Sequence, residues 1–144
     1  MKQTTWTVLA DRAQNAVHDA QNEVNEARQR LAKLDGSLEH LDRLRDDYIA
    51  RYNETQKVAH SISDTVTYRK FLEHLRGLRR KVEAQHQQAQ LELAEAREAL
   101  TKALREQAKM EAMVERDERN QALAEAKREQ RALDEAGLRL FNAR

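Results

Sequence analysis

Proline and cysteine are absent from this 144-residue chain, and glycine occurs only three times. Without proline, and with so little glycine, few residues oblige a helix to stop. The lack of cysteine excludes a disulfide scaffold and is typical of a reducing compartment. Long apolar runs are also missing, since the run from Trp6 to Ala10 is too short for a secretory signal and no window approaches a membrane span. We therefore expect a cytoplasmic protein.

What the chain does contain is charge of both signs, at 35% of its residues. The 26 basic residues nearly balance the 25 acidic ones, so no overall field recruits nucleic acid or an anionic membrane. The bias toward Ala, Glu, Lys, Leu and Arg is typical of long helices. The composition predicts an all-α fold.

Apolar side chains recur at alternating three- and four-residue spacing through the first third of the chain, as in one seam of a coiled coil. The series is Trp6, Ala10, Ala13, Val17, Ala20, Val24, Ala27, Leu31, Leu34, Leu38, Leu41, Tyr48 and Tyr52. Arg45 interrupts it, and it ends at Thr55. A seam of this length without a change of phase predicts one helix over about residues 5–57.

A turn is expected next, over about residues 58–65, where the period is lost and Ser, Asp and Thr gather. Ser63, Asp64 or Thr65 can cap a second helix over about residues 66–141. Its seam reads Tyr68, Phe71, Leu75, Leu78, Val82, Gln85, Ala89, Leu93, Ala96, Leu100, Ala103, Met110 and Val114. A slip in spacing between Ala89 and Leu93 predicts local unwinding of the supercoil without an end to the helix.

The two seams match if the helices run antiparallel and Tyr52 faces Phe71. This register places Tyr48 against Leu75 and Trp6 opposite Asp117. The second seam also fails at that point, in residues 115–121, which a continuous rod or a parallel dimer does not explain. We predict a single domain over residues 1–144, a long antiparallel two-helix coiled-coil hairpin with a C-terminal helical overhang.

The overhang carries an amphipathic stripe that has no partner within the hairpin. Its members are Leu123, Ala126, Leu133, Leu138, Leu140 and Phe141. Such a stripe is free to bind another protein. The alternative is a tail that associates with itself.

A two-helix hairpin is too thin to enclose a substrate pocket, so we expect no catalytic residue and no cofactor. Glu83 and His86 have the spacing of half a di-iron carboxylate site, but the second Glu-x-x-His is missing. The other histidines are scattered, and no glycine loop for phosphate exists. We expect no metal site.

One basic cluster opens the second helix, and basic helices that lead into a coiled coil can enter the major groove of DNA. It comprises Arg69, Lys70, Arg76, Arg79, Arg80 and Lys81. Seam residues interleave with these charges, and the facing helix supplies Asp42, Asp46 and Asp47. We interpret the cluster as a solvated face with interhelical ion pairs, and expect no nucleic-acid partner.

Two motifs resemble the FliJ family of flagellar type III export. The first is Leu41-x-x-Leu44-x-x-x-Tyr48-x-x-x-Tyr52. After a polar turn follows the second, Tyr68-Arg69-Lys70-Phe71-Leu72-x-x-Leu75-x-x-Leu78. The chain length and the charged second helix are also similar to the family, so the resemblance spans nearly the whole chain.

The resemblance implies a non-enzymatic stalk whose helix ends enter the hexameric ring of the export ATPase and promote its assembly and turnover. It also implies contact with the membrane-embedded export gate and with chaperones of late substrates, at the cytoplasmic side of the inner membrane. The implied gate patch is Leu41, Leu44, Tyr48, Phe71, Leu75 and Leu78. Most of these residues lie on the seam, where they can simply pack against each other, whereas Leu44 lies off it. A generic coiled-coil adaptor and the stalk of a virulence injectisome are the alternatives.

Overall fold

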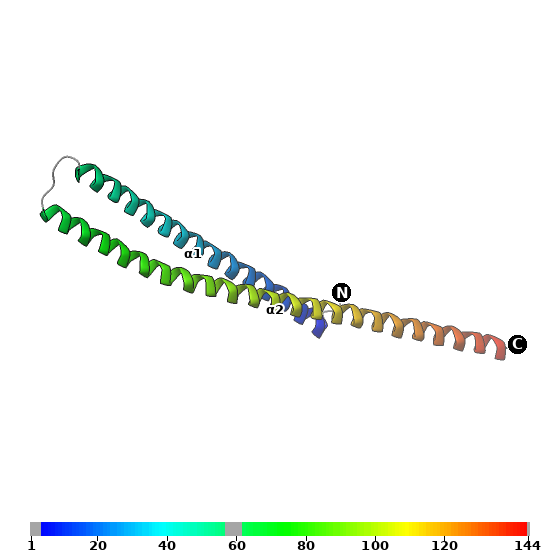
Figure 1. The fold of residues 1–144 in the computed structure, drawn as a ribbon. Helices are drawn as coiled ribbons and strands as arrows, with labels where there is room; N and C mark the ends of the chain where they lie inside the picture. The colour runs from blue at the N-terminus through cyan, green and yellow to red at the C-terminus, as the bar shows by residue number, and fades with distance from the viewer. Residues whose placement is uncertain (1–3, 57–61, 144) are drawn as a thin grey trace. The chain divides into compact units, whose positions relative to one another are not determined.

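The computed structural model describes residues 4–56 and 62–143, which form two α-helices and no strand (Figure 1). Helix α1 spans Thr5–Gln56 and helix α2 spans Ile62–Asn142, with 52 and 81 residues. Neither helix, as far as it is described, has an apolar stretch that would cross a membrane. The predicted all-α class, with two long helices packed as a hairpin, is confirmed.

The helix ends follow from local hydrogen bonds. The Thr4 hydroxyl caps α1 by accepting a hydrogen bond from the backbone N–H of Thr7 at 3.3 Å. Helix α2 begins at Ile62, earlier than expected, so Ser63, Asp64 and Thr65 lie inside its first turns. The expectation that one of the three caps the helix was wrong, because a first turn tolerates polar side chains beside its unpaired N–H groups. Half of the expected turn, residues 58–61, lies outside the described residues.

Two compact units share these helices: Ala20–Ala99 form one, and Met1–Asp19 with Leu100–Arg144 form the other. Within Ala20–Ala99, the two helices run antiparallel (Figure 1). Asp35 pairs with His86, and Asp42 pairs with Arg79, so the partner's number falls as the α1 number rises.

Within residues 4–56 and 62–143, all seven buried residues belong to the two predicted seams. They are Ala13, Val17, Val24 and Ala27 of α1, and Leu75, Ala89 and Leu93 of α2. Five of the seven are Ala or Val, because small side chains let two helices approach closely enough to exclude water without a third layer. The larger leucines of the α1 seam are only half-buried.

The α2 seam differs from its predicted path at two positions. Leu78 and Gln85 are exposed, and the half-buried inner positions belong instead to Arg79 and His86. The inner residues from the turn onward are Leu75, Arg79, Val82, His86, Ala89, Leu93 and Ala96. This order alternates four and three without interruption, so the predicted slip at Ala89 is wrong. Arg79 and His86 occupy inner positions because each pairs with an aspartate of α1. Arg79 pairs with Asp42, and His86 pairs with Asp35.

In the other unit the same period continues along α2 and then stops. Its half-buried positions are Leu100, Ala103, Gln107, Met110, Val114 and Asp117, together with Met113. Every residue from Glu118 to Ala143 is exposed. The covered part of α2 therefore ends at Asp117, the residue that the sequence placed opposite Trp6. We call residues 118–143 the C-terminal tail.

Candidate functional site

Aromatic rings join the helices next to the turn. The ring of Tyr52 stacks on that of Tyr68, with centroids 3.7 Å apart and planes 10° from parallel. The Tyr48 ring lies 5.3 Å from Tyr68 and 4.1 Å from Phe71. The hydroxyls of Tyr52 and Thr65 share a hydrogen bond of 3.2 Å. The stack covers apolar area while the Tyr52 hydroxyl keeps a polar partner, as buried tyrosines usually require.

These contacts correct the predicted register. Tyr52 stacks on Tyr68 rather than facing Phe71, and Phe71 lies against Tyr48, where Leu75 was expected. Farther from the turn the difference shrinks, and the Arg30–Glu92 ion pair of 3.5 Å lies one residue from the predicted register. A repeating seam matches itself at more than one axial shift, so the specific ring contacts select among the shifts.

The six residues of the predicted gate patch fall into two groups. Leu75 is only 5% exposed, and Leu41, Tyr48 and Phe71 are half-buried between the helices. Leu44 and Leu78 are each 38% exposed. The first group holds the hairpin together, whereas the second presents apolar surface that a partner can cover.

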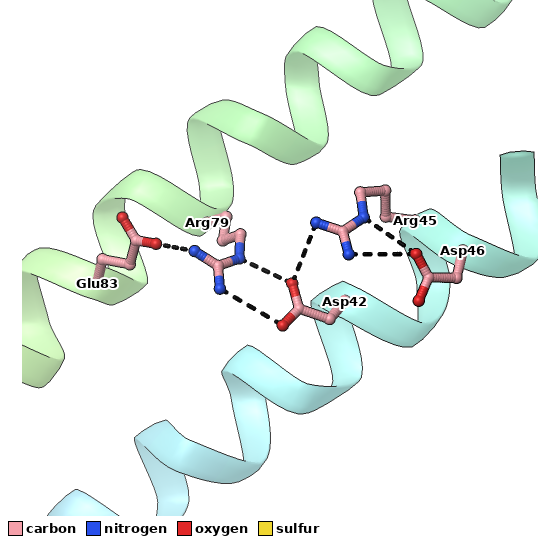
Figure 2. Close-up of polar contacts among 5 residues, drawn as sticks. All are labelled: Asp42, Arg45, Asp46, Arg79 and Glu83. Atoms are coloured by element: carbon pink, nitrogen blue, oxygen red, sulfur yellow. Dashed lines mark hydrogen bonds and ion pairs between the residues drawn. The ribbon is translucent and has the colours of Figure 1, made fainter.

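Beside these residues lies a polar network of five charged side chains (Figure 2). Arg79 donates two hydrogen bonds to the Asp42 carboxylate, at 2.8 Å from Nε and 3.4 Å from Nη2. Arg79 also pairs with Glu83 one turn along α2. Arg45, which interrupts the α1 seam, pairs with Asp42 at 3.6 Å and with Asp46 at 3.2 Å. The interruption is therefore a charge neutralised by two neighbours on its own helix.

The bidentate contact changes the acidity of both partners. The hydrogen bond from Arg79 lowers the pKa of Asp42, and the nearby charges of Arg79 and Arg45 act in the same direction. The same hydrogen bond raises the pKa of Arg79. The predicted interhelical pairing thus holds for Arg79 with Asp42, while Asp46 pairs within α1.

A small pocket beside this network includes residues that the seam pattern missed. Its volume is about 170 Å³, and Ile49 and Leu72 line it together with Leu41 and Leu75. Ile49 directly follows Tyr48 and Leu72 directly follows Phe71. Two adjacent apolar residues on each helix were the available signal, because they widen the apolar face beyond one seam.

Glu83 and His86, the two halves of the Glu-x-x-His spacing, are engaged elsewhere. Glu83 pairs with Arg79, and His86 Nε2 lies 2.6 Å from Asp35 Oδ1. In the described ranges, His, Asp and Glu side chains nowhere gather in threes as a metal ion would require. Both residues are explained by contacts between or along the helices.

The stripe predicted on the tail is exposed along its length. Leu123, Leu133, Leu138, Leu140 and Phe141 are between 61% and 75% exposed, and Ala126 is exposed too. Large apolar side chains repeated along one helix at this exposure are unusual for a surface that stays in water. The tail is thus a second candidate surface, at the other end of α2 from Leu78.

A comparison with protein families identifies the family to which this pair of helices belongs. The family described as "Flagellar FliJ protein" matches residues 3–144. The chain belongs to the FliJ family. Comparisons of this FliJ family chain with curated proteins and with solved structures give no significant match.

FliJ family membership makes the chain a component of the flagellar export apparatus, and the family is non-catalytic. The resemblance carried by the two motifs around the turn is therefore confirmed. The two candidate surfaces can now be considered as contacts within that apparatus.

Proposed function

We propose that this chain is the stalk of the flagellar export apparatus, with its helix ends in the ring of the export ATPase and its turn end toward the membrane export gate. In this role it promotes assembly of the ring and ATP turnover, and it passes late-substrate chaperones toward the gate. It acts on the cytoplasmic side of the inner membrane, where these partners hold it. The observation that carries the proposal is the tail, exposed along its whole described length while it retains an apolar stripe.

The tail suits insertion into a ring because its apolar side chains are already ordered on a helix. Burying one large apolar side chain contributes about 1.5–3 kcal/mol, and the tail carries five that are mostly exposed. A preformed helix loses less conformational entropy on binding than a disordered segment does. Apolar anchors repeated along a helix are the means by which an amphipathic helix binds in a groove of its partner.

The turn end suits a different kind of contact. Leu44 and Leu78 add exposed apolar surface to a framework held by the aromatic stack and the Asp42–Arg79 pair. A partner that covers these two leucines meets a surface whose shape is already set by the packed helices. Such preorganisation favours specific contact over a small area.

The ATPase contact is tested by turnover of the cognate export ATPase at concentrations where its ring is only partly assembled. We expect the full-length chain to raise the rate and a variant that ends at Glu118 to lose this effect. Replacement of Leu133 and Leu140 by Glu in the full-length chain should reproduce the loss. Circular dichroism checks that each variant stays helical. No stimulation by the folded full-length chain would contradict the stalk and favour a generic adaptor.

The gate contact is tested separately with Leu44→Glu. We expect weaker binding to the purified cytoplasmic domain of the gate protein and reduced motility of cells that carry the variant. The matched control is Leu91→Glu, because Leu91 is an exposed leucine of α2 outside the patch. Equal motility and gate binding for both variants would overturn the assignment of Leu44.

A further inference from the structure

A long groove follows one side of the hairpin formed by Ala20–Ala99, and it has two compartments. One, of about 500 Å³, lies among Glu23, Glu26, Glu95 and Ala96. The other, of about 580 Å³, lies among Lys33, Leu34, Ala84 and Ala89. Both compartments are also lined by Arg30 and Glu92, so they adjoin at the ion pair that these two residues form at 3.5 Å.

The two compartments differ in charge. After Arg30 and Glu92 neutralise each other, Glu23, Glu26 and Glu95 leave the first compartment acidic. The second keeps Lys33 as its free charge, above an apolar floor. Among the described residues, neither Glu26 nor Lys33 forms an ion pair. Along α1 the groove therefore changes from acidic to apolar and basic within two turns, which selects for an occupant with the opposite order.

The tail of the chain itself has this opposite order. Lys127, Arg128 and Arg131, with Glu129 among them, form a block of net positive charge that precedes Asp134 and Glu135, and Leu133 lies between the two blocks. Lys127 and Asp134 are seven residues apart, as Glu26 and Lys33 are in α1. Seven residues make nearly two helical turns, so each pair occupies one face of its helix at a separation of about 10 Å.

The tail charges are also available. Lys127 and Asp134 are exposed, and Asp134 accepts a hydrogen bond from Gln130 on the same helix, at 3.3 Å. The residues that flank them on the apolar face, Leu123 and Leu133, are more than 60% exposed. A helix with these features can place apolar and charged groups in the groove together.

We propose that the long groove of one copy binds the tail of a second copy, with the tail parallel to α1. Lys127 then lies at Glu26, Asp134 lies at Lys33, and Leu133 covers the apolar floor formed by Leu34, Ala84 and Ala89. The occupant belongs to a second copy because Glu92 and Lys127 lie in the same continuous helix, which does not fold back on itself without a break. The antiparallel orientation sets Asp134 beside the acidic compartment and is disfavoured by repulsion.

This inference goes beyond the proposed function and does not rest on it. If the stalk proposal also holds, a tail seated in a second copy is unavailable to the ATPase ring. Self-association then acts as a storage form that releases on dilution or on competition by the ring. Its test contains no ATPase, so the two proposals succeed or fail separately.

The experiment is a set of charge reversals in the full-length chain, read by sedimentation velocity over a concentration series. Glu26→Lys and Lys127→Glu should each weaken self-association by about threefold to tenfold, because each replaces an attractive exposed pair by a repulsive one. The double variant restores the pair in reverse and should return to within about twofold of the original chain. Lys33→Glu with Asp134→Lys forms a second, independent set.

Glu54→Lys is the matched control, because Glu54 is exposed on α1 and lies outside the groove. It changes net charge as Glu26→Lys does and should leave self-association unaltered. Three results overturn the proposal. The first is a chain that stays monomeric up to about 1 mM, a concentration at which even weak association is detected. The second is an association that neither single reversal weakens. The third is a pair of double variants that fail to restore the association.

Discussion

The hairpin of residues 20–99 and the tail of residues 118–143 are built from the same kinds of residue, yet they have opposite surroundings. Both are helical and both carry apolar side chains at helical spacing. Leu75 in the hairpin is 5% exposed, whereas Leu133 in the tail is 67% exposed. An amphipathic helix therefore forms in both places, and only the presence of a matched second helix decides whether its apolar face is covered.

The contacts that hold the two regions differ accordingly. The hairpin has contacts between helices, among them the Tyr52–Tyr68 stack and the Asp42–Arg79 pair. The tail has local side-chain contacts such as the 3.3 Å hydrogen bond from Gln130 to Asp134. Contacts of the second kind are worth only a few tenths of a kcal/mol each. The tail is thus the region where a partner has the larger effect on stability.

The largest expected difference between the regions comes from removing a leucine side chain. Leu75→Ala should lower the free energy of unfolding by about 2–3 kcal/mol, at the low end of buried Leu→Ala changes because a two-helix core is thin. Leu133→Ala, its match in the tail, should leave the unfolding of the hairpin unchanged. Urea unfolding followed by circular dichroism measures both. Equal effects would mean that the tail is covered in the free protein.

The next effect concerns the ring stack. Tyr68→Leu should cost about 1 kcal/mol, because it keeps apolar area but removes the aromatic contacts with Tyr52 and Tyr48. Tyr68→Phe keeps the ring and is the control, with little expected change. Thermal unfolding of the three proteins provides the comparison. If Tyr68→Leu matches the original chain, the stack does not set the register.

Replacing a glycine by alanine should stabilise the hairpin when the glycine lies in α1 but not when it lies in the tail. A Cβ at Gly36 would meet no atom within 4 Å, and the residue is exposed within α1. Gly36→Ala should therefore raise the free energy of unfolding by about 0.5–1 kcal/mol. Gly137→Ala has equal space in the tail and should increase helicity there without shifting hairpin unfolding. Destabilisation by Gly36→Ala would show that α1 is bent or covered at this point.

The smallest effect is a dependence on pH that the tail lacks. The hydrogen bond from Arg79 lowers the pKa of Asp42 in the folded hairpin below its value in the unfolded chain. This contribution to stability is complete above the unfolded pKa of about 3.9 and is lost as the pH falls through the lower folded value. Asp42→Asn should therefore flatten the acid limb of the stability profile slightly, since the pair is partly exposed.

Asp47→Asn is the control for this profile, because Asp47 is exposed on the same helix and lies outside the network of Figure 2. Unfolding free energies measured from neutral pH to about pH 3 give the two profiles. An Asp42→Asn profile as steep as that of Asp47→Asn would mean that the Arg79 contact adds nothing in solution.

The sequence pattern predicted some positions of the seams correctly and others wrongly, for a physical reason. In α1 the buried residues Ala13, Val17, Val24 and Ala27 lie where the spacing placed them. In α2, Leu78 and Arg79 are both compatible with a three-four spacing, and the apolar residue was the natural choice. Arg79 takes the inner position because Asp42 lies across from it, a fact that periodicity within α2 does not contain.

The candidate surfaces also include features that the sequence predicts and features that it does not. The exposed stripe of the tail follows from spacing and from the failure of the seam near Asp117, both of which are visible in the sequence. The exposure of Leu78 and the groove along Arg30 and Glu92 are not visible, because they depend on which α2 residues meet α1. Local periodicity predicts a helix face, while a groove needs two faces in register.

Amino-acid spacing alone is enough to predict two long helices, the phase of the α1 seam and the point in α2 where the covered part ends. These features depend on residues within a few turns of each other, through helix propensity and amphipathic spacing. Contacts between the two helices establish the axial register, the stack of Tyr52 on Tyr68, and the inner positions of Arg79 and His86. Each of these depends on contacts between residues far apart in the chain, and several registers of a repeating seam are similar in energy until such contacts distinguish them.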